Sequence, residues 1–272
     1  MILINGRAEN RIEITDRGLQ YGDGLFETLP YRNGYLEYLD AHLKRLTLGC
    51  ERLSIPFQHL DLLITELETF CHTLIDDFVI KIIITRGSGG RGYFANNIEP
   101  TRIISSHPFP TYPDTYSQLG VSVRLCKHKL SENPILAGIK HLNRLDQVIA
   151  RNEWDDTTIA EGLMFDQQNN LIEATMSNIF IVKSGQLLTP LLTTSGIVGV
   201  MRAEIIRLAI EHDIPVKEVV LTQKDLLNAD EVFVCNSVNG LWPVNFITDT
   251  QHTYPVGSVT KLCQDLIMQA QK

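Results

Sequence analysis

The chain has 272 residues, a formal net charge of −8 at pH 7 and a hydrophobic content of 44%. This length allows one large domain or two of ordinary size, each with a sizeable core. Nucleic-acid or anionic-membrane binding calls for a basic face, so the negative charge favours neither partner. The five cysteines are odd in number and lack Cys-x-x-Cys spacing. They predict reduced packing residues in a cytoplasmic protein, and we find no metal-binding motif.

The first part of the chain predicts an α+β domain over residues 1–107. Apolar runs predict strands at 2–4, 34–39, 78–85 and 101–106, and helical spacing through His42, Leu43, Leu46 and Cys50 predicts a helix over 39–53. Three prolines at 108, 110 and 113 break regular structure, so residues 108–119 are interpreted as a linker.

A second α+β domain is expected over residues 120–272. Strands are predicted at 120–126, 162–165, 178–183 and 231–235. Helices are predicted at 144–152, after residue 200 with apolar residues at helical spacing, and at 260–271. The whole chain is therefore expected to have a mixed α/β fold of the α+β class.

Lys140 is the most informative residue, because the apolar, strand-like run Ile135–Arg144 places one amine in an expected interior. Most lysines are solvated or direct their ammonium group outward, so a surface role is the first alternative. Apolar surroundings disfavour the charged form of lysine and lower its pKa. The free amine could then act as a nucleophile, a Schiff-base partner or a proton carrier.

Other residues supply what pyridoxal phosphate requires besides a lysine. Glu173 interrupts an apolar strand and could pair with a protonated ring nitrogen. Glycines in Ser195–Arg202 precede a helical run whose first N–H groups could bind phosphate. Asn236–Ser237 after a strand and Arg45 could add donors. Singly, each pattern is typical of an ordinary turn, cap or solvated arginine, but together they describe one complete cofactor site.

The order of these segments resembles the class IV, or fold type IV, pyridoxal-phosphate enzymes, a two-domain fold in which residues 120–272 would form the C-terminal cofactor-binding domain. The resemblance covers nearly the whole chain and is carried by Tyr21–Thr28 (YGDGLFET), His42–Leu46 (HLKRL), the Lys140 segment, Glu173–Phe180 (EATMSNIF) and Gly199–Arg202 (GVMR). The family contains branched-chain aminotransferases, D-amino acid aminotransferases and 4-amino-4-deoxychorismate lyases. Thr85–Tyr93 (TRGSGGRGY) and Leu136–Gln147 (LAGIKHLNRLDQ) are similar to the lyases in particular.

The resemblance implies a role for each matching residue. Lys140 matches the aldimine lysine, which also abstracts the substrate proton, and Glu173 matches the pyridinium partner. The implied cofactor-binding residues are Arg45, Lys140, Glu173, Asn178, Val200, Met201 and Ser237, of which Arg45 and Ser237 would bind the phosphate through side chains and Val200 and Met201 through backbone N–H groups. The implied substrate-binding residues are Phe26, Thr28, Arg91 and Tyr93, although a glycine-rich loop such as the one before Tyr93 is as often only a surface turn.

The activity implied is conversion of 4-amino-4-deoxychorismate into 4-aminobenzoate and pyruvate, a step of folate biosynthesis, with pyridoxal 5′-phosphate as cofactor. An aminotransferase acting on branched-chain or D-amino acids is the alternative, because it would use the same lysine. Phe26 stands where D-amino acid aminotransferases carry a tyrosine, which weakens that branch of the alternative. A non-catalytic relative would have lost Lys140 or Glu173. The resemblance also implies a homodimer.

Overall fold

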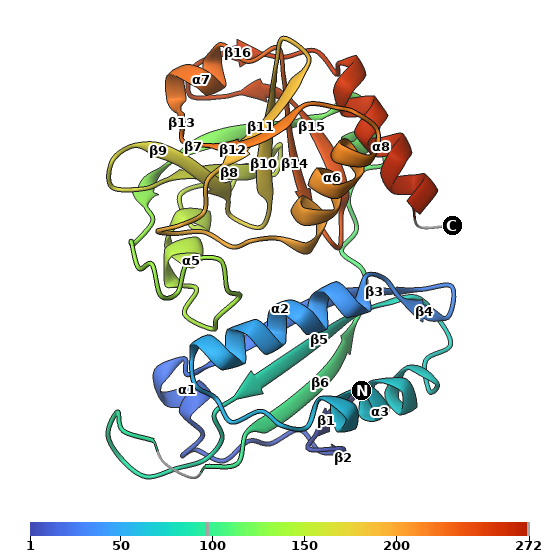
Figure 1. Ribbon diagram of the computed structural model, residues 1–272, viewed down its shortest axis with the longest axis vertical. Coiled ribbons are helices and arrows are strands. Elements are labelled where there is room, and N and C mark those ends of the chain that lie inside the picture. The colour runs from blue at the N-terminus through green and yellow to red at the C-terminus, as the bar shows by residue number, and fades with distance from the viewer. Residues whose placement is uncertain (96–97, 271–272) are drawn as a thin grey trace. The chain divides into compact units, whose positions relative to one another are not determined.

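The computed structural model describes residues 1–95 and 98–270, which divide into two compact units (Figure 1). The first unit contains Met1–Pro110 and Ile139–Asn143, and the second contains Thr111–Gly138 and Arg144–Lys272. The second unit thus begins inside the predicted linker. Residues 139–143, including Lys140, lie with the first unit rather than with the region 120–272.

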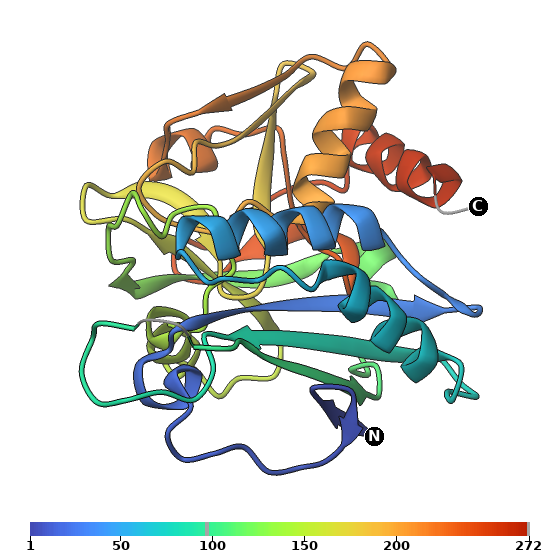
Figure 2. The same cartoon turned by 60° about the horizontal axis from the view of Figure 1, so that its bottom comes forward.

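The first unit is a six-stranded antiparallel sheet in the order β2-β1-β6-β5-β3-β4. Its elements are β1 (Ile2–Ile4), β2 (Arg7–Ala8), α1 (Arg17–Tyr21), β3 (Gly24–Arg32), β4 (Tyr35–Leu36), α2 (Leu39–Arg52), α3 (Leu60–Cys71), β5 (Phe78–Thr85) and β6 (Thr101–His107). Helix α2 lies along the sheet (Figure 2).

Strand β3 presents different residues to the two faces of this sheet. Leu25, Glu27 and Leu29 are buried, and Leu25 packs against α2 at Gly49, where a Cβ would lie 2.8 Å from the leucine methyl carbons. Side chains alternate along a strand, so Phe26 and Thr28 point to the opposite face, where both are half-buried. One face therefore builds the core, and the other remains accessible.

The second unit is built on a ten-stranded sheet in the order β12-β11-β10-β14-β15-β7-β8-β9-β13, with β16 paired to β15. Helices α6 and α8 pack against each other and against β14. The elements are α4 (Thr115–Leu119), β7 (Val121–Lys129), α5 (Leu145–Arg151), β8 (Ile159–Phe165), β9 (Asn170–Ala174), β10 (Asn178–Lys183), β11 (Gln186–Pro190), α6 (Val200–Glu211), β12 (Val216–Val219), β13 (Leu221–Thr222), α7 (Gln223–Leu227), β14 (Glu231–Asn236), β15 (Gly240–Ile247), β16 (His252–Thr253) and α8 (Ser258–Ala270).

The mixed helix-and-strand class expected from the sequence is confirmed, but two local predictions are wrong. The strand predicted at 34–39 is reduced to Tyr35–Leu36, because the chain turns through Tyr38 in the left-handed region, with φ of 53°, before α2 begins. The strand-like run around Lys140 forms no regular strand. It is irregular and is held by two isolated bridges, from Gly138 to Ile197 and from Leu25 to His141.

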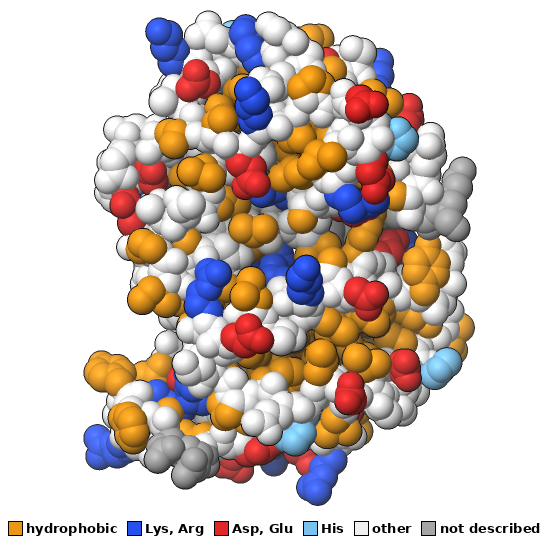
Figure 3. Space-filling model, in the orientation of Figure 1, with side chains coloured by type: hydrophobic (Ala, Val, Ile, Leu, Met, Phe, Trp, Pro, Cys, Tyr) orange, Lys and Arg blue, Asp and Glu red, His pale blue; other side chains and the backbone are white. Residues whose placement is uncertain are grey.

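The surface of the described residues mixes both signs of charge. On the face drawn in Figure 3, acidic and basic side chains are interspersed with apolar ones over each unit. Within residues 1–95 and 98–270, no helix combines the length and apolar character needed to cross a bilayer.

Candidate active site

Lys140 is fixed by backbone hydrogen bonds to β3. The N–H of Phe26 donates to the carbonyl of Lys140 at 2.9 Å, and the N–H of Leu142 donates to the carbonyl of Gly24 at 3.0 Å. Gly24 is required here because a Cβ would lie 2.8 Å from the Leu142 side chain and 2.5 Å from the carbonyl oxygen of Ile84. The irregular segment around Lys140 is thus fixed to β3 by backbone hydrogen bonds of the kind that join neighbouring strands.

The amine of Lys140 lies over an aromatic ring. Its Nζ is 4.4 Å from the centroid of Phe26, and the Nζ of Lys81 is 5.3 Å from the same centroid. Lys81 reaches this place because it pairs across the sheet with Thr28, two residues beyond Phe26 on the accessible face. The amines of Lys140 and Lys81, the ring of Phe26 and the hydroxyl of Thr28 therefore lie on one face of β3 and β5.

Arg45 is held beside β3 by the buried carboxylate of Glu27. Its Nε donates to Glu27 at 2.8 Å and a second guanidinium nitrogen donates to the other oxygen, while Nδ1 of His42 lies 2.6 Å from Glu27. Burial favours a raised pKa for Glu27, but the charge of Arg45 and the hydrogen bonds from Arg45 and His42 outweigh it and lower the pKa to about 2. Glu27 is therefore ionised at neutral pH.

His42 is neutral in this cluster. Burial lowers the pKa of His42 below its usual range, against the opposing effect of Glu27. Since an ionised Glu27 can only accept, Nδ1 of His42 carries the proton. Its Nε2 is buried and has no hydrogen-bond partner within the described chain.

Glu173 is held in one orientation in the second unit. Its two carboxylate oxygens accept from the Ile197 N–H at 2.8 Å and from Nε2 of Gln147 at 3.0 Å. Gly196 has a φ of +82°, and a Cβ there would lie 2.7 Å from Ile172 and 3.3 Å from Glu173. Glycine at this position lets the next N–H reach the carboxylate.

At the N-terminus of α6, the backbone lies close to the side chain of Asn178. Nδ2 of Asn178 donates to the carbonyl of Ile197 at 2.8 Å, and a Cβ on Gly199 would lie 2.0 Å from Oδ1 of Asn178. Val200 and Met201 begin the helix, and within the part of the chain that the structure covers no side chain caps it. The first N–H groups of such a helix suit an anion.

Ser237 lies half-buried in the turn after β14, which Asn236 shapes. Oδ1 of Asn236 accepts from the N–H groups of Val238 and Asn239, and its Nδ2 donates to Oγ of Ser177 at 3.1 Å. Ser177 donates in turn to Glu161 at 2.8 Å. The buried carboxylate of Glu161 thus supports this turn through two hydrogen bonds.

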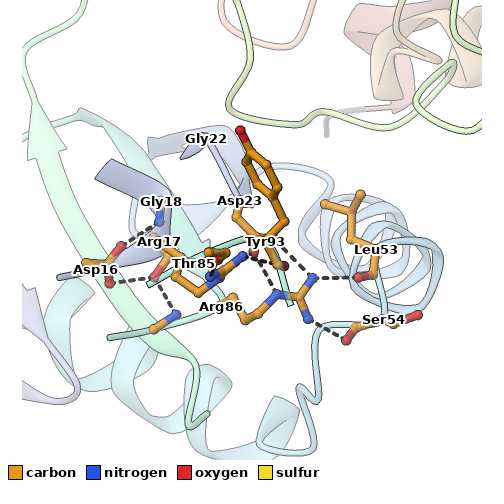
Figure 4. A network of polar contacts seen from close by, with 12 residues as sticks. Asp16, Arg17, Gly18, Gly22, Asp23, Leu53, Ser54, Thr85, Arg86 and Tyr93 are labelled. Atoms are coloured by element: carbon orange, nitrogen blue, oxygen red, sulfur yellow. Dashed lines mark hydrogen bonds and ion pairs between the residues drawn. The ribbon is translucent and has the colours of Figure 1, made fainter. Parts of the chain in front are cut away.

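The loop from Arg86 to Tyr93 carries the proposed substrate-binding residues Arg91 and Tyr93, and both are exposed. Arg86, at the start of this loop, is engaged within the protein. It donates two hydrogen bonds to Asp23, at 2.7 and 3.1 Å, and one each to the carbonyls of Leu53 and Ser54 (Figure 4). Arg86 is therefore a structural residue here.

The first unit thus brings Lys140, Phe26 and Thr28 together and links Arg45 to them through β3. The second brings Glu173 and Asn178 to the Ile197 backbone beside Val200 and Met201, and connects Ser237 through Asn236. Sequence reasoning missed Glu27, His42, Lys81 and Glu161 as supporting residues. Lys81 is the one charged residue of the strand predicted at 78–85, and this signal could have indicated it. β3 has no regular alternation of apolar and polar residues, so no local pattern indicated Glu27.

Comparisons with known proteins agree with this arrangement. The model of the amino-transferase class IV family matches residues 24–247. Aminodeoxychorismate lyase of Vibrio harveyi is 37% identical over 268 residues, covering 97% of this chain and 98% of the relative. D-alanine aminotransferase of Bacillus licheniformis is 28% identical over 90% of this chain and 88% of the relative.

Solved structures show the same fold. The crystal structure of 4-amino-4-deoxychorismate lyase from Pseudomonas aeruginosa has a TM-score of 0.95 and 44% identity, covering 99% of this chain and 98% of that one. The branched-chain amino acid aminotransferase of Escherichia coli has a TM-score of 0.85 and 25% identity, covering 100% and 94%. With a family model matched over most of its length and a relative above 30% identity along nearly all of it, the chain belongs to the class IV aminotransferase family.

Proposed function

We propose that this chain is a pyridoxal-phosphate-dependent lyase that converts 4-amino-4-deoxychorismate into 4-aminobenzoate and pyruvate. Enzymes of its family use pyridoxal phosphate. The choice of lyase over aminotransferase is supported by identities of 37% and 44% to two lyases, against 32% to a putative branched-chain-amino-acid aminotransferase of Methanocaldococcus jannaschii and 28% and 25% to two further aminotransferases. An aminotransferase acting on branched-chain or D-amino acids is the second candidate.

Each unit, taken by itself, carries groups of the kind that pyridoxal phosphate requires. Lys140 offers an amine over the Phe26 ring, Glu173 offers a fixed carboxylate, and α6 offers uncapped N–H groups at Val200 and Met201. The absence of a Cβ at Gly199 allows Asn178 to lie against the start of α6, because a Cβ there would be 2.0 Å from Oδ1 of Asn178. When bound, the cofactor supplies an electron-withdrawing ring that acidifies the C–H bond next to the substrate nitrogen.

We assign the cofactor-binding roles by the charge of each partner. Glu173 would accept a hydrogen bond from the ring nitrogen and keep it protonated, because Ile197 and Gln147 hold its carboxylate in one place. Val200 and Met201 would donate backbone N–H groups to the phosphate. Ser237 would add its hydroxyl and Asn178 would maintain the shape of the cradle through Ile197.

Arg45 would contribute a positive charge to phosphate binding. Its bidentate pair with Glu27 fixes the guanidinium plane, and the burial of Glu27 prevents that carboxylate from moving away. A fixed guanidinium loses less conformational freedom on binding an anion than a free one. Glu27 and His42 therefore act on the phosphate only through Arg45.

Lys140 would move the proton in the reaction itself. Its free amine would take the proton from the substrate ring carbon that carries the amino nitrogen, a proton that the bound cofactor would acidify. The bond between the neighbouring ring carbon and the enolpyruvyl oxygen then breaks and the ring becomes aromatic. The released enolpyruvate takes up a proton at its methylene carbon and becomes pyruvate. The Phe26 ring stabilises the ammonium form of Lys140, which is the form present after proton transfer.

Both carboxylates of the substrate need cationic partners. Lys81 lies over the same Phe26 ring as Lys140, so we propose it for one of them. We propose Arg91 for the other, with Tyr93 and Thr28 as hydrogen-bonding neighbours. Arg91 is exposed, and no ion pair of its side chain is found in residues 1–95 and 98–270.

The test is to supply enzymatically made 4-amino-4-deoxychorismate to the pyridoxal-phosphate-loaded protein and to follow both products. Equal amounts of 4-aminobenzoate and pyruvate without any keto-acid are expected. Lys140→Ala should lose both this turnover and the absorbance of lysine-bound cofactor. Amino transfer that requires a keto-acid, with no 4-aminobenzoate formed, would favour the aminotransferase, and full activity of Lys140→Ala would refute the role of this lysine.

We also propose that the protein is a homodimer located in the cytoplasm. On α5, Leu145, Val148 and Ile149 lie on one side at helical spacing and are 72%, 50% and 50% exposed. An apolar side of a helix left in solvent is unfavourable, which supports its burial against a second copy. The five cysteines are free and buried, which supports a reducing compartment.

A further inference from the structure

One buried arginine, Arg17, holds both ends of the glycine-rich loop that follows β5. Its backbone N–H donates to the carbonyl of Gly87 at 3.0 Å. Its guanidinium donates to the carbonyl of Gly92 at 2.7 Å. It also donates to the carbonyl of Tyr93 at 2.9 Å (Figure 4). The side chain of Arg17 is only 4% exposed. A charged group of this kind is buried only where it is fully engaged.

Asp23 fixes the guanidinium of Arg17 in turn. The Asp23 carboxylate accepts from Nε of Arg17 at 3.0 Å and from Nε of Arg86 at 2.7 Å (Figure 4). Burial favours a raised pKa for Asp23, but the two arginines outweigh it and hold the pKa below its usual value. The carboxylate therefore stays ionised at neutral pH, and Arg17 keeps its orientation.

The tip of the loop has little packing of its own. No heavy atom of the described chain lies within 4 Å of where a Cβ would stand on Gly90 or Gly92. The Tyr93 side chain is 88% exposed and meets the protein through an edge contact with Tyr21, at a centroid distance of 5.7 Å. Arg17 also lies over that Tyr21 ring, 4.7 Å from its centroid. The order of this loop end therefore depends on Arg17.

We propose that Arg17 is a positioning residue for substrate binding, which holds the Gly92–Tyr93 backbone so that Arg91 and Tyr93 are presented in one conformation. This inference rests on the proposed function, because it takes Arg91 and Tyr93 as substrate-binding residues. A glycine-rich loop must lose conformational freedom when it binds a ligand. Arg17 restricts the loop before the substrate binds, and so lowers the entropic cost of binding an anionic substrate.

The first experiment measures the order of the loop without using activity. Trypsin cleaves after arginine, and the bond between Arg91 and Gly92 lies next to both carbonyls that Arg17 holds. Cleavage of the cofactor-loaded protein at this bond is followed by the masses of fragments 1–91 and 92–272. Arg17→Met loses two hydrogen bonds from a charged donor, so a larger fraction of its molecules should have the loop detached and open to trypsin. The cleavage rate of Arg17→Met should therefore be about a hundredfold higher than that of the unmodified protein.

Arg86→Met is the matched control, because it removes the other arginine of Asp23 but no bond to Gly92 or Tyr93. Its cleavage rate at Arg91 should stay within about threefold of the unmodified protein. Arg17→Lys keeps a buried charge beside Asp23, so it serves if Arg17→Met does not fold. One ammonium cannot span both carbonyls as a guanidinium does, and an intermediate rate is expected. Unchanged cleavage in Arg17→Met, or in Arg17→Lys if only that variant folds, would overturn the proposal, as would equal acceleration in Arg86→Met.

The second experiment asks whether the ordered loop serves the substrate. With 4-amino-4-deoxychorismate, Arg17→Met should raise KM about tenfold while kcat stays within about threefold, because ground-state and transition-state binding are weakened alike. Arg17→Lys should recover part of the loss. Faster cleavage with unchanged KM would refute the substrate role of Arg17. If the unmodified protein shows no lyase turnover, the proposed function fails, and the trypsin comparison alone decides whether Arg17 orders the loop.

Discussion

Replacing Glu27 by Gln is expected to destabilise the folded protein in a pH-dependent way. The Glu27 carboxylate has a folded pKa of about 2, against a reference value of 4.5. The difference of about 2.5 units corresponds to about 3 kcal/mol of stability at neutral pH, at about 1.4 kcal/mol per unit. Most of this stability comes from the buried pair with Arg45.

The sign of the pH dependence follows from the lowered pKa. A carboxylate whose folded pKa is depressed contributes its full stabilisation above the unfolded value of 4.5 and loses it as the pH falls toward 2. Near pH 3.5 the unfolded state binds most of one proton at this residue while the folded state binds almost none. The expected loss there is on the order of 1 kcal/mol.

The assay is urea unfolding of the cofactor-free protein at pH 7 and near pH 3.5, for the unmodified chain and Glu27→Gln. The difference in unfolding free energy between the unmodified chain and Glu27→Gln should be smaller at the lower pH by on the order of 1 kcal/mol. Glu68→Gln, on the exposed side of α3, controls for the loss of one negative charge. A gap that is equally wide at both pH values would refute the reasoning, since it would mean that Glu27 does not titrate between folded and unfolded states.

Three further substitutions probe other parts of the molecule. Gly199→Ala places a Cβ 2.0 Å from Oδ1 of Asn178, so the affinity for pyridoxal phosphate, measured by equilibrium titration, should fall about tenfold. Lys81→Met should raise KM for 4-amino-4-deoxychorismate about tenfold in steady-state kinetics while leaving the cofactor absorbance unchanged. Val148→Asp, on the exposed side of α5, should shift the protein toward monomer in sedimentation velocity, because a charge would be buried at the proposed interface.

Each of these three has a control of the same chemistry. Gly90→Ala adds a methyl group in open space, Lys44→Met removes an exposed charge on α2, and Ile210→Asp adds a charge to an exposed apolar position of α6. An equal effect in a control variant would refute the role proposed for the residue with which it is paired. If the unmodified protein is itself a monomer, the proposed interface at α5 is refuted, and with it the prediction for Val148→Asp.

The sequence predicted well where the signal is local. The helix after Gly199 and the strand around Glu173 were found because their spacing and their glycines lie within a few residues of the functional positions. Amphipathic spacing predicted α2 to within a residue of its C-terminus, since the buried side of that helix is read directly from its own residues. These elements carry Arg45, Glu173, Val200 and Met201.

The sequence failed where the structure depends on residues far apart in the chain. Strand β3 was not predicted, because polar residues and Pro30 interrupt its apolar pattern, and Lys140 was taken for part of a strand. Both errors have one cause: the Lys140 segment receives its hydrogen bonds from β3, more than a hundred residues earlier. Likewise, no local pattern indicates that Glu27 would bind Arg45, or that Asp23 would join Arg17 to Arg86.

The attachment of residues 139–143 to β3 has a consequence for the order of folding. During synthesis, the open edge of β3 is complete long before its partner exists, and the N–H of Phe26 and the carbonyl of Gly24 gain their protein partners only after Leu142 has been made. The first unit therefore cannot be completed from a contiguous N-terminal fragment ending at Pro110. The last piece that finishes this unit is the one that carries Lys140, so the amine reaches its place over Phe26 in the same step that closes the sheet edge.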